Sequence, residues 1–489
     1  MAKTTHPEWV YARFATYTSV RTYIDIYAPR STPRCYLFSK LFFSRLACSL
    51  CVHPYYPYPP APPPGEIVAR IPTSQCLTRL DCIHHETVSK LRTSIGDEKE
   101  WLAELGAALL LERIDIKNSP LLGYLNSLPQ REKDVVASWP DGQKRFLTGT
   151  DVDRALRDER AAARAEWERY VRPEISKLKL SDDSLTFENY LDARSVISSR
   201  AFSVTHETGP GLVPIADLFN HKTGDNHVVM RLVDETQAED GSESKNEKTL
   251  VAEIKHSVKK NQEVFNTYGH LGNAVLLNSY GFCQENNPAD VVTVTVPDVR
   301  ASAAMTGISG SAIAKTLNVL ISENVFTDNE MFALSKESPP PTGLLVALWA
   351  VMTEDAEFTR VQQEVSRVRV EPTSEQTDSA SRWKHAVEKK TTESTESPGL
   401  QTLEALGVFV AILERRRSMY KYVPDGDAES SSSWKRSLKI LVDSERSIIE
   451  HYLKRAKDEI VLNEKRGGEQ KIRKTEEPAK KEDAFALFD

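Results

Sequence analysis

Two short motifs near the middle of the chain bring polar side chains to the ends of apolar segments. Asn220 and His221 follow an apolar run that begins at Gly211. Tyr268 ends a second apolar run 48 positions after Asn220. An amide, an imidazole and a phenol can each hold a ligand by hydrogen bonds. Either motif alone occurs by chance in most chains of this size, so the interpretation rests on both motifs together with their neighbours.

Each candidate residue also has a structural explanation. Tyr268 and Tyr280 could be core tyrosines whose hydroxyls are satisfied within the protein. Asn220 could cap the turn that follows it, since asparagine favours turns. Arg200 could form a surface ion pair, and the side chain of Asp217 could serve structure alone.

The elements that position these motifs follow from hydrophobic periodicity. Short apolar runs predict strands at 65–72, 211–216, 228–233, 249–254 and 263–268. An acidic, apolar-poor loop is expected at 234–248, where the composition predicts mobility. Helical periodicity predicts helices at 99–114, 151–171 and 187–198. A helical block over about 80–198 therefore separates the first strand from the others.

The C-terminal part is predicted to be helical after a strand at 291–296. The segment 343–352 is apolar nearly all round, as in a buried helix. Two long amphipathic helices are expected at 400–420 and 434–461. Their inward residues should be Leu403, Leu406, Phe409, Ile412, Leu438, Leu441, Ile448 and Tyr452. The composition predicts a mobile loop over about 353–399 and a charged, disordered tail over 464–489.

The first 64 residues differ from the rest of the chain. They carry seven lysines and arginines against two acidic residues, and they end in a proline-rich run from Pro54 to Pro64. We expect this segment to be disordered or to come from a wrongly placed gene start. A transit peptide is the second interpretation, because the segment is arginine-rich and poor in acids. A membrane anchor is the third, although Lys40 and Arg45 interrupt the apolar stretch.

Bulk composition narrows the class of protein. The formal charge of −7 at pH 7 argues against a general nucleic-acid binder. Six scattered cysteines favour a reducing compartment over a disulfide framework. Cys48 and Cys51 have the spacing of a metal or redox pair, but no second pair accompanies them. The remaining histidines have no metal-ligand spacing, so no metal is expected.

Four ordered motifs resemble those of the split-SET protein-lysine methyltransferases. The motifs are 198–202 (SSRAF), 213–221 (VPIADLFNH), 264–268 (VFNTY) and 276–282 (LLNSYGF). The similarity extends over about 65–465 and is greatest to the non-histone branch related to the Rubisco large-subunit and ribosomal-protein lysine methyltransferases. It implies an α+β fold: a SET-domain β-fold with a knot-like crossing of the C-terminal motifs, a helical insertion and an all-α C-terminal substrate-docking domain.

The resemblance also assigns roles to individual residues. Tyr268 matches the active-site tyrosine beside the transferred methyl group. The residues that match the site for S-adenosyl-L-methionine are Asn220, His221 and Arg200, where Arg200 would pair with the cofactor carboxylate. The residues that match the lysine channel are Ser199, Asp217, Tyr280 and Phe282. Tyr280 and Phe282 would form its walls, and backbone carbonyls of Ser199, Arg200 and Asp217 would hold the amine.

The expected organisation is an atypical segment at 1–64, a SET domain at 65–290, a helical substrate-binding domain at 291–463 and the tail at 464–489. The expected activity is methylation of a lysine on a non-histone protein, with a ribosomal protein as the expected substrate and S-adenosyl-L-methionine as the cofactor. The expected state is a monomer in the nucleus or cytoplasm, with the nucleus favoured and with neither nucleic acid nor membrane as a direct partner.

One departure from the family keeps two alternatives open. The family begins its SET domain with a Gly-x-Gly strand turn, whereas here the proline run directly precedes Gly65 and Glu66. Glycine permits close backbone approach to a cofactor, so one wall of the pocket lacks its usual sequence. The first alternative is an inactive SET-fold protein that binds partners. The second is a histidine methyltransferase, which the Asn266-Thr267-Tyr268 form disfavours.

Overall fold

The computed structural model describes residues 9–11, 25–29, 64–95, 100–178, 180, 183–235, 247–258, 263–367, 379–393, 401–421 and 433–476. The chain divides into two compact units. The first contains Met1–Arg145, Val152–Ala289 and Val423–Ile440. The second contains Phe146–Asp151, Asp290–Tyr422 and Leu441–Asp489. The segment expected to be atypical, 1–64, lies outside the described residues except for 9–11, 25–29 and Pro64.

The first unit contains two antiparallel sheets and one pair of parallel strands. The sheet orders are β1-β2-β3-β9-β8 and β4-β6-β5, and the parallel pair is β10-β7. The strand bounds are β1 Trp9–Tyr11, β2 Asp25–Pro29, β3 Ile67–Pro72, β4 Leu77–Thr78, β5 Ala201–Thr205, β6 Gly209–Leu212, β7 Asn220–His221, β8 Val228–Glu235, β9 Glu247–Ile254 and β10 Phe265–Asn266. The predicted strands at 65–72, 228–233 and 249–254 are confirmed. The acidic loop expected at 234–248 lies outside the described residues over 236–246.

The large sheet covers one hydrophobic core with alternate residues of its strands. Leu250, Ala252 and Ile254 of β9 are buried together with Ala69 and Ile71 of β3. The alternation follows from the pleat, which sends successive side chains to opposite faces of a strand. This core supports the loop that carries the first motif.

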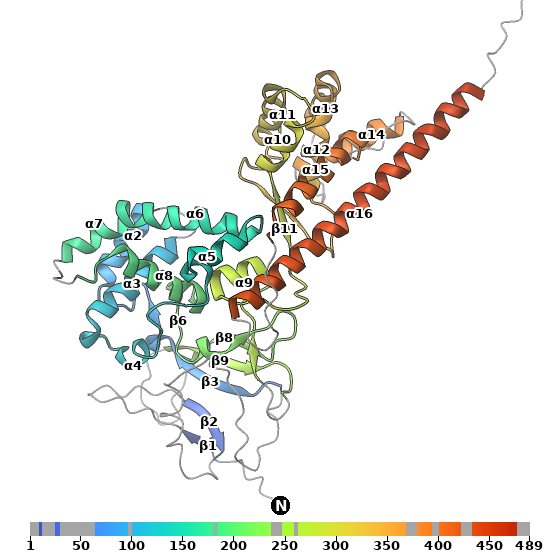
Figure 1. The fold of residues 1–489 in the computed structure, drawn as a ribbon. Coiled ribbons are helices and arrows are strands. Elements are labelled where there is room, and N and C mark those ends of the chain that lie inside the picture. The colour runs from blue at the N-terminus through green and yellow to red at the C-terminus, as the bar shows by residue number, and fades with distance from the viewer. Residues whose placement is uncertain are drawn as a thin grey trace, which may run out of the picture. The chain divides into compact units, whose positions relative to one another are not determined.

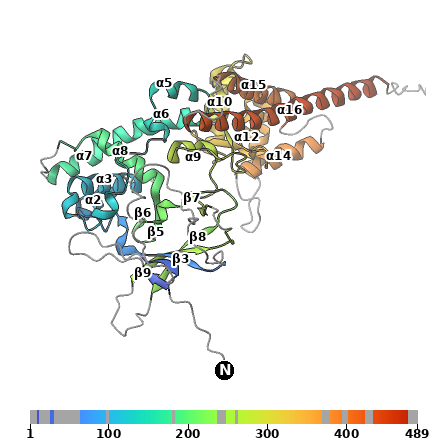
Figure 2. The same cartoon turned by 60° about the horizontal axis from the view of Figure 1, so that its bottom comes forward.

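The helices of the first unit precede and follow these strands. Their bounds are α2 His85–Ile95, α3 Glu100–Ile114, α4 Leu122–Leu125, α5 Asp141–Lys144, α6 Asp151–Glu166, α7 Arg172–Ile175, α8 Phe187–Arg200 and α9 Asn273–Tyr280. Figures 1 and 2 show α2, α3, α7 and α8 gathered on one side of the unit, with β6 between them and β3. The predicted helices at 99–114 and 187–198 are confirmed. The predicted helix at 151–171 is α-helical to Glu166 and continues as a π-helical turn over Trp167–Val171.

Helix α3 is buried nearly all round and packs on α8. Its residues Ala107 to Leu111 are all within 2% of complete burial. Gly106 permits the close approach, because a Cβ there would lie 2.9 Å from Cγ of Arg194 and 3.1 Å from the ring of Tyr190. This close packing on α3 fixes the position of α8, whose last turn contains Ser199 and Arg200.

The described residues of the second unit are helical apart from one antiparallel strand pair. The bounds are β11 Val292–Thr295, α10 Val296–Ala304, α11 Gly310–Ser322, β12 Met331–Leu334, α12 Thr342–Met352, α13 Asp355–Arg367, α14 Ser379–Glu393, α15 Leu403–Met419 and α16 Ser433–Glu476, whose first turns belong to the first unit. The predicted strand at 291–296 and buried helix at 343–352 are confirmed, but an all-α unit is wrong because β11 pairs with β12. None of the described helices is long and apolar enough to cross a membrane.

Two predictions for this unit are wrong in part. The loop expected over 353–399 contains α13 and α14. Sparse apolar residues bury one face of each helix within a polar composition, namely Phe358, Val361, Val365, Trp383, Ala386 and Val387. The tail expected from 464 is helical to Glu476, and 477–489 lies outside the described residues. The expected inward residues of α15 and α16 are buried, except Leu403, which is 38% exposed at the start of α15.

A buried group of charges lies in the second unit. Arg416 of α15 contacts Asp151 at 2.6 Å and Glu445 at 3.6 Å. Glu445 accepts hydrogen bonds from the backbone N–H of Asp151, at 3.1 Å, and from the hydroxyl of Tyr420, at 2.6 Å. Two carboxyl groups therefore share one guanidinium away from water. Burial, followed by the nearby Asp151 charge, raises the pKa of Glu445 to about 8.

We predict that Glu445 makes the second unit less stable as pH rises from 5 to 8. In the folded state Glu445 keeps its proton to about pH 8, whereas the unfolded chain releases it near pH ~4.3. The folded state therefore binds more protons in this window, and its stability falls by up to about 1.4 kcal/mol per pH unit. Thermal unfolding at pH 5.5 and 8.5 measures the effect.

The Glu445→Gln variant should lose this contribution because glutamine resembles the protonated acid. Glu450→Gln, an exposed change on the same helix, is the matched control and should follow the wild type. An equal difference between wild type and Glu445→Gln at both pH values would contradict the prediction.

Candidate functional site

The parallel pair β7–β10 places the two sequence motifs side by side. Asn220 is opposite Phe265, and His221 is opposite Asn266. The pairing is extended by the backbone N–H of Lys222, which donates to the carbonyl of Asn266 at 2.9 Å. The predicted strand at 263–268 is thus shorter than expected. Its two paired residues are nevertheless enough to carry Tyr268 to the first motif.

Both ring nitrogens of His221 are used within the protein. Nδ1 accepts a hydrogen bond from the backbone N–H of Tyr268 at 2.9 Å. Nε2 lies 2.8 Å from the hydroxyl of Thr223. Since Nδ1 is an acceptor, the neutral ring carries its proton on Nε2 and donates to Thr223. Burial lowers the pKa of His221 to about 4, which keeps the ring neutral at physiological pH.

Tyr268 lies in a stack of aromatic rings. Its ring centroid is 5.0 Å from that of His221 and 4.7 Å from that of Tyr280, and both pairs are stacked. Phe282 lies 6.2 Å from His221 and 6.4 Å from Tyr280. The hydroxyl of Tyr268 donates to the carbonyl oxygen of Phe219 at 2.8 Å. The position of the phenol is therefore fixed by its backbone, its two ring faces and its hydroxyl.

Burial raises the pKa of the Tyr268 hydroxyl, and the neighbouring Tyr280 raises it further. The phenol is therefore neutral at physiological pH and acts as a hydrogen-bonding group rather than as a base. The charges of Arg200, Asp217 and Glu132 also act on this hydroxyl. The aromatic stack and the charged residues are thus parts of one site.

The C-terminus of α9 sets the positions of Tyr280 and Phe282. Gly281, between them, ends the helix with φ of +80°, a left-handed conformation that glycine adopts without strain. A Cβ at Gly281 would lie 2.6 Å from the carbonyl carbon of Asp134 and 2.8 Å from the nitrogen of Val135. The two aromatic residues are therefore anchored against the backbone of the 134–135 segment.

Arg200 bridges two acidic residues at the other side of the site. Its Nε lies 2.6 Å from a carboxylate oxygen of Glu132, and its Nη1 lies 3.3 Å from the Asp217 carboxylate. The side chain of Asp217 is only 3% exposed and also accepts a hydrogen bond from the Tyr124 hydroxyl at 3.2 Å. Burial raises the pKa of Asp217, whereas Arg200 and Tyr124 oppose that rise.

A strained turn delivers Asp217 to this position. Ile215 has φ of +69° and ψ of −42°. The backbone N–H of Ala216 donates to the carbonyl of Pro214 at 2.8 Å, which closes a three-residue γ-turn around Ile215. A β-branched residue at positive φ is a genuine outlier, and such strain gathers at functional sites. This turn explains why the predicted strand at 211–216 ends at Leu212.

The structure brings most of the predicted site residues together. Tyr268, Tyr280 and Phe282 are partly exposed and can reach a ligand, as can Arg200. Asn220 donates from its side-chain amide to Glu263 at 2.5 Å. Ser199 lies in the last turn of α8, where helix carbonyls have no partner within the helix.

His221 differs from the expectation in its surroundings. It is 6% exposed, and its ring nitrogens bind Tyr268 and Thr223. Its imidazole therefore positions the two motifs, and a ligand contact through the ring nitrogens has no basis here. Sequence reasoning missed Thr223, Glu132 and Tyr124. Glu132 is 68 positions from Arg200 and Tyr124 is 93 positions from Asp217, so no local signal connects them.

The donor set suits a small ligand with both a carboxylate and an aromatic ring. The guanidinium of Arg200 has five N–H donors, and its contacts to Glu132 and Asp217 engage only Nε and Nη1. Its side chain is 25% exposed. The rings of Tyr280 and Phe282 supply apolar faces. Over the part of the chain that is described, no cluster of three or more His, Cys, Asp or Glu residues could hold a metal ion.

We predict that Ile215 reverses the usual stability order of glycine and alanine. Both Ile215→Gly and Ile215→Ala remove the side chain, but only glycine relieves the positive φ. Relief of about 1–2 kcal/mol exceeds the ~0.4–1 kcal/mol by which glycine usually destabilises through the unfolded chain. Chemical denaturation should therefore show the glycine variant to be the more stable of the two.

Ala201 provides the matched control, because its φ is −74°. Ala201→Gly should destabilise the protein in the ordinary way. If Ile215→Ala proved as stable as Ile215→Gly or more so, the strain inferred at this turn would be absent.

Comparisons with known proteins bear on the fold and on the family that the sequence resembles. No protein-family model matches the chain. The chain is 28% identical over 193 residues to the ribosomal lysine N-methyltransferase set10 of Schizosaccharomyces pombe. This alignment covers 38% of the chain and 32% of set10. It is 26% identical over 254 residues to the N-lysine methyltransferase SETD6 of Rattus norvegicus. This alignment covers 49% of the chain and 50% of SETD6.

The chain thus spans half or less of the length of these curated relatives. Among solved structures, the SET domain of LSMT bound to lysine and AdoHcy is similar, with a TM-score of 0.58 and 16% identity. The likeness covers 83% of this chain and 85% of that one. The chain therefore has the SET-domain fold, and its sequence resembles the non-histone SET-domain protein-lysine methyltransferases.

Proposed function

We propose that this chain is a protein-lysine N-methyltransferase that uses S-adenosyl-L-methionine. One observation carries the proposal: Tyr268 is held between the rings of His221 and Tyr280, with its hydroxyl fixed on the carbonyl of Phe219. The names of set10 and SETD6 support the activity, and the solved LSMT structure that holds lysine and AdoHcy supports the cofactor class.

The reaction requires alignment more than acid–base power. S-adenosyl-L-methionine supplies a methyl group on a sulfonium, and the amine of the substrate lysine displaces it in line. No leaving group needs a proton, so the protein must fix the reacting groups in a near-attack geometry. The several contacts that fix Tyr268 give the site the rigidity that this chemistry requires.

The cofactor would lie between the charged and the aromatic parts of the site. Arg200 would bind its carboxylate through donors not used by Glu132 and Asp217, a charge-assisted bond suited to a guanidinium. The amide of Asn220 and the backbone beside His221 would hold its polar groups. The rings of Tyr280 and Phe282 would cover its apolar surface.

The lysine must arrive as the neutral amine. Free lysine has a pKa of ~10.4, so less than about 0.1% is neutral at pH 7. An aromatic channel disfavours the charged ammonium by desolvation and so lowers that pKa. Tyr268 stays protonated because its pKa is raised. Its hydroxyl proton is donated to Phe219, which leaves the phenol oxygen to accept a hydrogen bond from the amine.

We further propose a ribosomal protein as the substrate, because set10 is named for that activity. The helical second unit would dock this protein, and carbonyls of Ser199, Arg200 and Asp217 would hold its amine. For such a substrate we propose the nucleus or the cytoplasm as the compartment, with the nucleus favoured. We expect a monomer that contacts no nucleic acid directly.

Two alternative functions can be separated from lysine methylation by experiment. An inactive SET-fold protein would bind partners without cofactor, and the unusual sequence before Gly65 favours it. A histidine methyltransferase would use the same fold on another nucleophile. Amino-acid analysis of the methylated product separates lysine from histidine methylation directly.

We predict saturable, micromolar binding of S-adenosyl-L-methionine in a calorimetric titration of the whole chain. Asn220→Ala should weaken it at least about tenfold, since a lost hydrogen bond to a charged ligand contributes roughly 1.5–3 kcal/mol. Asn118→Ala, at an exposed asparagine whose amide contacts Asp115, is the matched control and should bind normally. Absence of binding by the folded protein would support the inactive alternative.

We also predict that Tyr268→Phe separates catalysis from cofactor binding. The variant keeps the ring stack but loses the hydroxyl. Transfer of labelled methyl to proteins of a methylation-deficient cell extract should fall about 10–1000-fold, as when a positioned polar group is removed. Cofactor affinity should change less than about threefold. Tyr170→Phe, at a tyrosine outside the site, should transfer normally, and unchanged transfer by Tyr268→Phe would refute its assignment.

A further inference from the structure

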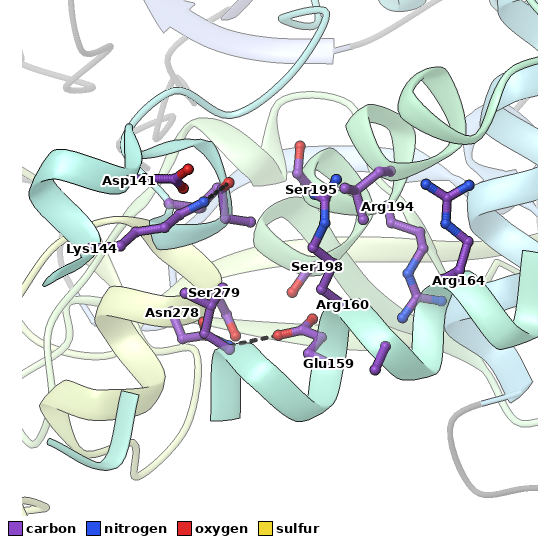
Figure 3. Close-up of a pocket in the computed structure, with 15 residues that line it drawn as sticks. Asp141, Lys144, Glu159, Arg160, Arg164, Arg194, Ser195, Ser198, Asn278 and Ser279 are labelled. Atoms are coloured by element: carbon purple, nitrogen blue, oxygen red, sulfur yellow. Dashed lines mark hydrogen bonds between the residues drawn. The ribbon is translucent and has the colours of Figure 1, made fainter. Parts of the chain in front are cut away.

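A cavity separate from the candidate site lies among α5, α6, α8 and α9 of the first unit (Figure 3). Its volume is about 550 Å³. Its lining residues are Val135, Ala137, Asp141, Lys144, Leu156, Glu159, Arg160, Ala161, Arg164, Leu191, Arg194, Ser195, Ser198, Asn278 and Ser279. Of these residues only Val135 also supports the site described above, through its backbone beside Gly281. Cavities of ~300–1,000 Å³ accommodate small organic ligands.

The cavity combines an apolar surface with an excess of positive charge. Its apolar lining comes from Val135, Ala137, Leu156, Ala161 and Leu191. Four basic residues line it against two acidic ones. An excess of positive charge on a largely apolar wall fits a ligand that has an apolar body and an acidic group.

Two of the basic residues are already committed to partners. Arg194 pairs with Glu166 at 2.5 Å, and both side chains are largely buried. Arg164 lies over the ring of Phe187, 3.7 Å from its centroid, and pairs with Glu168. Figure 3 shows Arg164 and Arg194 at the end of the cavity away from Asp141 and Lys144. Arg164 and Arg194 therefore line the cavity, but their charges are already paired and do not serve to bind an anion.

The other two basic residues can exchange their contacts at low cost. Lys144 donates from Nζ to the carbonyl of Ala137 at 3.0 Å. Arg160 pairs with Glu188 at 3.2 Å, with the two side chains 52% and 64% exposed. Exposed pairs of this kind contribute about 0–1 kcal/mol. An anion between Lys144 and Arg160 would therefore contact two cations, and the contacts that these side chains give up in exchange contribute little to stability.

The two acidic residues offset this pair only in part. The carboxylate of Glu159 accepts a hydrogen bond from the amide of Asn278 at 2.9 Å (Figure 3). Burial lowers the pKa of Lys144, the charge of Asp141 opposes this shift, and the charge of Arg160 adds a smaller lowering. The two cations thus repel each other, and an anion between them would relieve the repulsion. Hydroxyls of Ser198 and Ser279 add polar contacts.

We propose that this cavity binds a small organic anion, with its acidic group between Lys144 and Arg160 and its apolar body against Val135, Leu156 and Leu191. This binding site is independent of the methyl-transfer site, so it does not rest on the proposed function. The neighbouring residues Ser199 and Tyr280 extend the same helices into that site.

Fluorescence titration of the whole chain with 8-anilinonaphthalene-1-sulfonate tests the proposal, because this probe carries one sulfonate on an aromatic body. We expect saturable binding to one site. The uncharged N-phenyl-1-naphthylamine has the same body without the sulfonate and should bind at least tenfold more weakly. Equal affinities for the two probes, or no saturable binding, would overturn the anion site.

Variants locate the bound probe. Lys144→Gln and Arg160→Gln, singly and together, should weaken sulfonate binding, with at least a tenfold loss in the double variant. Arg172→Gln removes the same charge from an exposed residue outside the cavity and should bind as the wild type does. Ala161→Leu adds bulk at the wall and should weaken both probes. Wild-type affinity in the double variant, with its circular dichroism unchanged, would place the probe elsewhere and refute the proposal.

Discussion

The parallel pairing of β7 with β10 is the constraint on which the candidate site depends. Only Asn220 and His221 pair with Phe265 and Asn266, yet this short ladder joins segments more than 40 positions apart. A pairing of two residues would be weak alone. The ring of His221 strengthens it, because Nδ1 accepts from the Tyr268 backbone and Nε2 donates to Thr223. A neutral, buried histidine thus acts as a fixed link between the motifs.

The remaining contacts of Tyr268 follow from that link. Once the backbone at Tyr268 is held, its ring can lie only between His221 and Tyr280, and its hydroxyl reaches the carbonyl of Phe219. Tyr280 is placed by the glycine that ends α9 against the 134–135 backbone. The same segment carries Glu132, which pairs with Arg200. One loop of the helical insertion therefore supports both sides of the site.

On the charged side of the site, a ligand carboxylate and the carboxylates of Glu132 and Asp217 would compete for Arg200. Arg200 already faces two carboxylates, and Asp217 is buried beside it. A ligand carboxylate that approaches Arg200 must share the guanidinium with Glu132 or displace it. Since Arg200 has donors beyond Nε and Nη1, sharing requires no rearrangement of Asp217. The strained γ-turn at Ile215 keeps Asp217 in place, and such strain persists only where surrounding structure holds it.

The sequence by itself determined the elements and the two motifs. Periodicity is a local property, so it located α3, α8, α12 and the strands β3, β8 and β9 of the large sheet. It failed where composition hid sparse apolar contacts, as in α13 and α14, where Phe358 and Trp383 are buried within polar segments. Motif resemblance supplied the candidate site residues, because family motifs preserve spacing along the chain.

Only the tertiary structure decided how those residues act together. The partners Glu132 and Tyr124 come from the helical insertion, far in sequence from Arg200 and Asp217. The left-handed turn at Ile215 contradicts the preference of its own residue type, so no local rule could predict it. Whether His221 faces a ligand or the protein depended on Thr223 and Tyr268 being near its two nitrogens. Hydrogen bonds between distant segments depend on how those segments pack together, and local sequence patterns do not determine that packing.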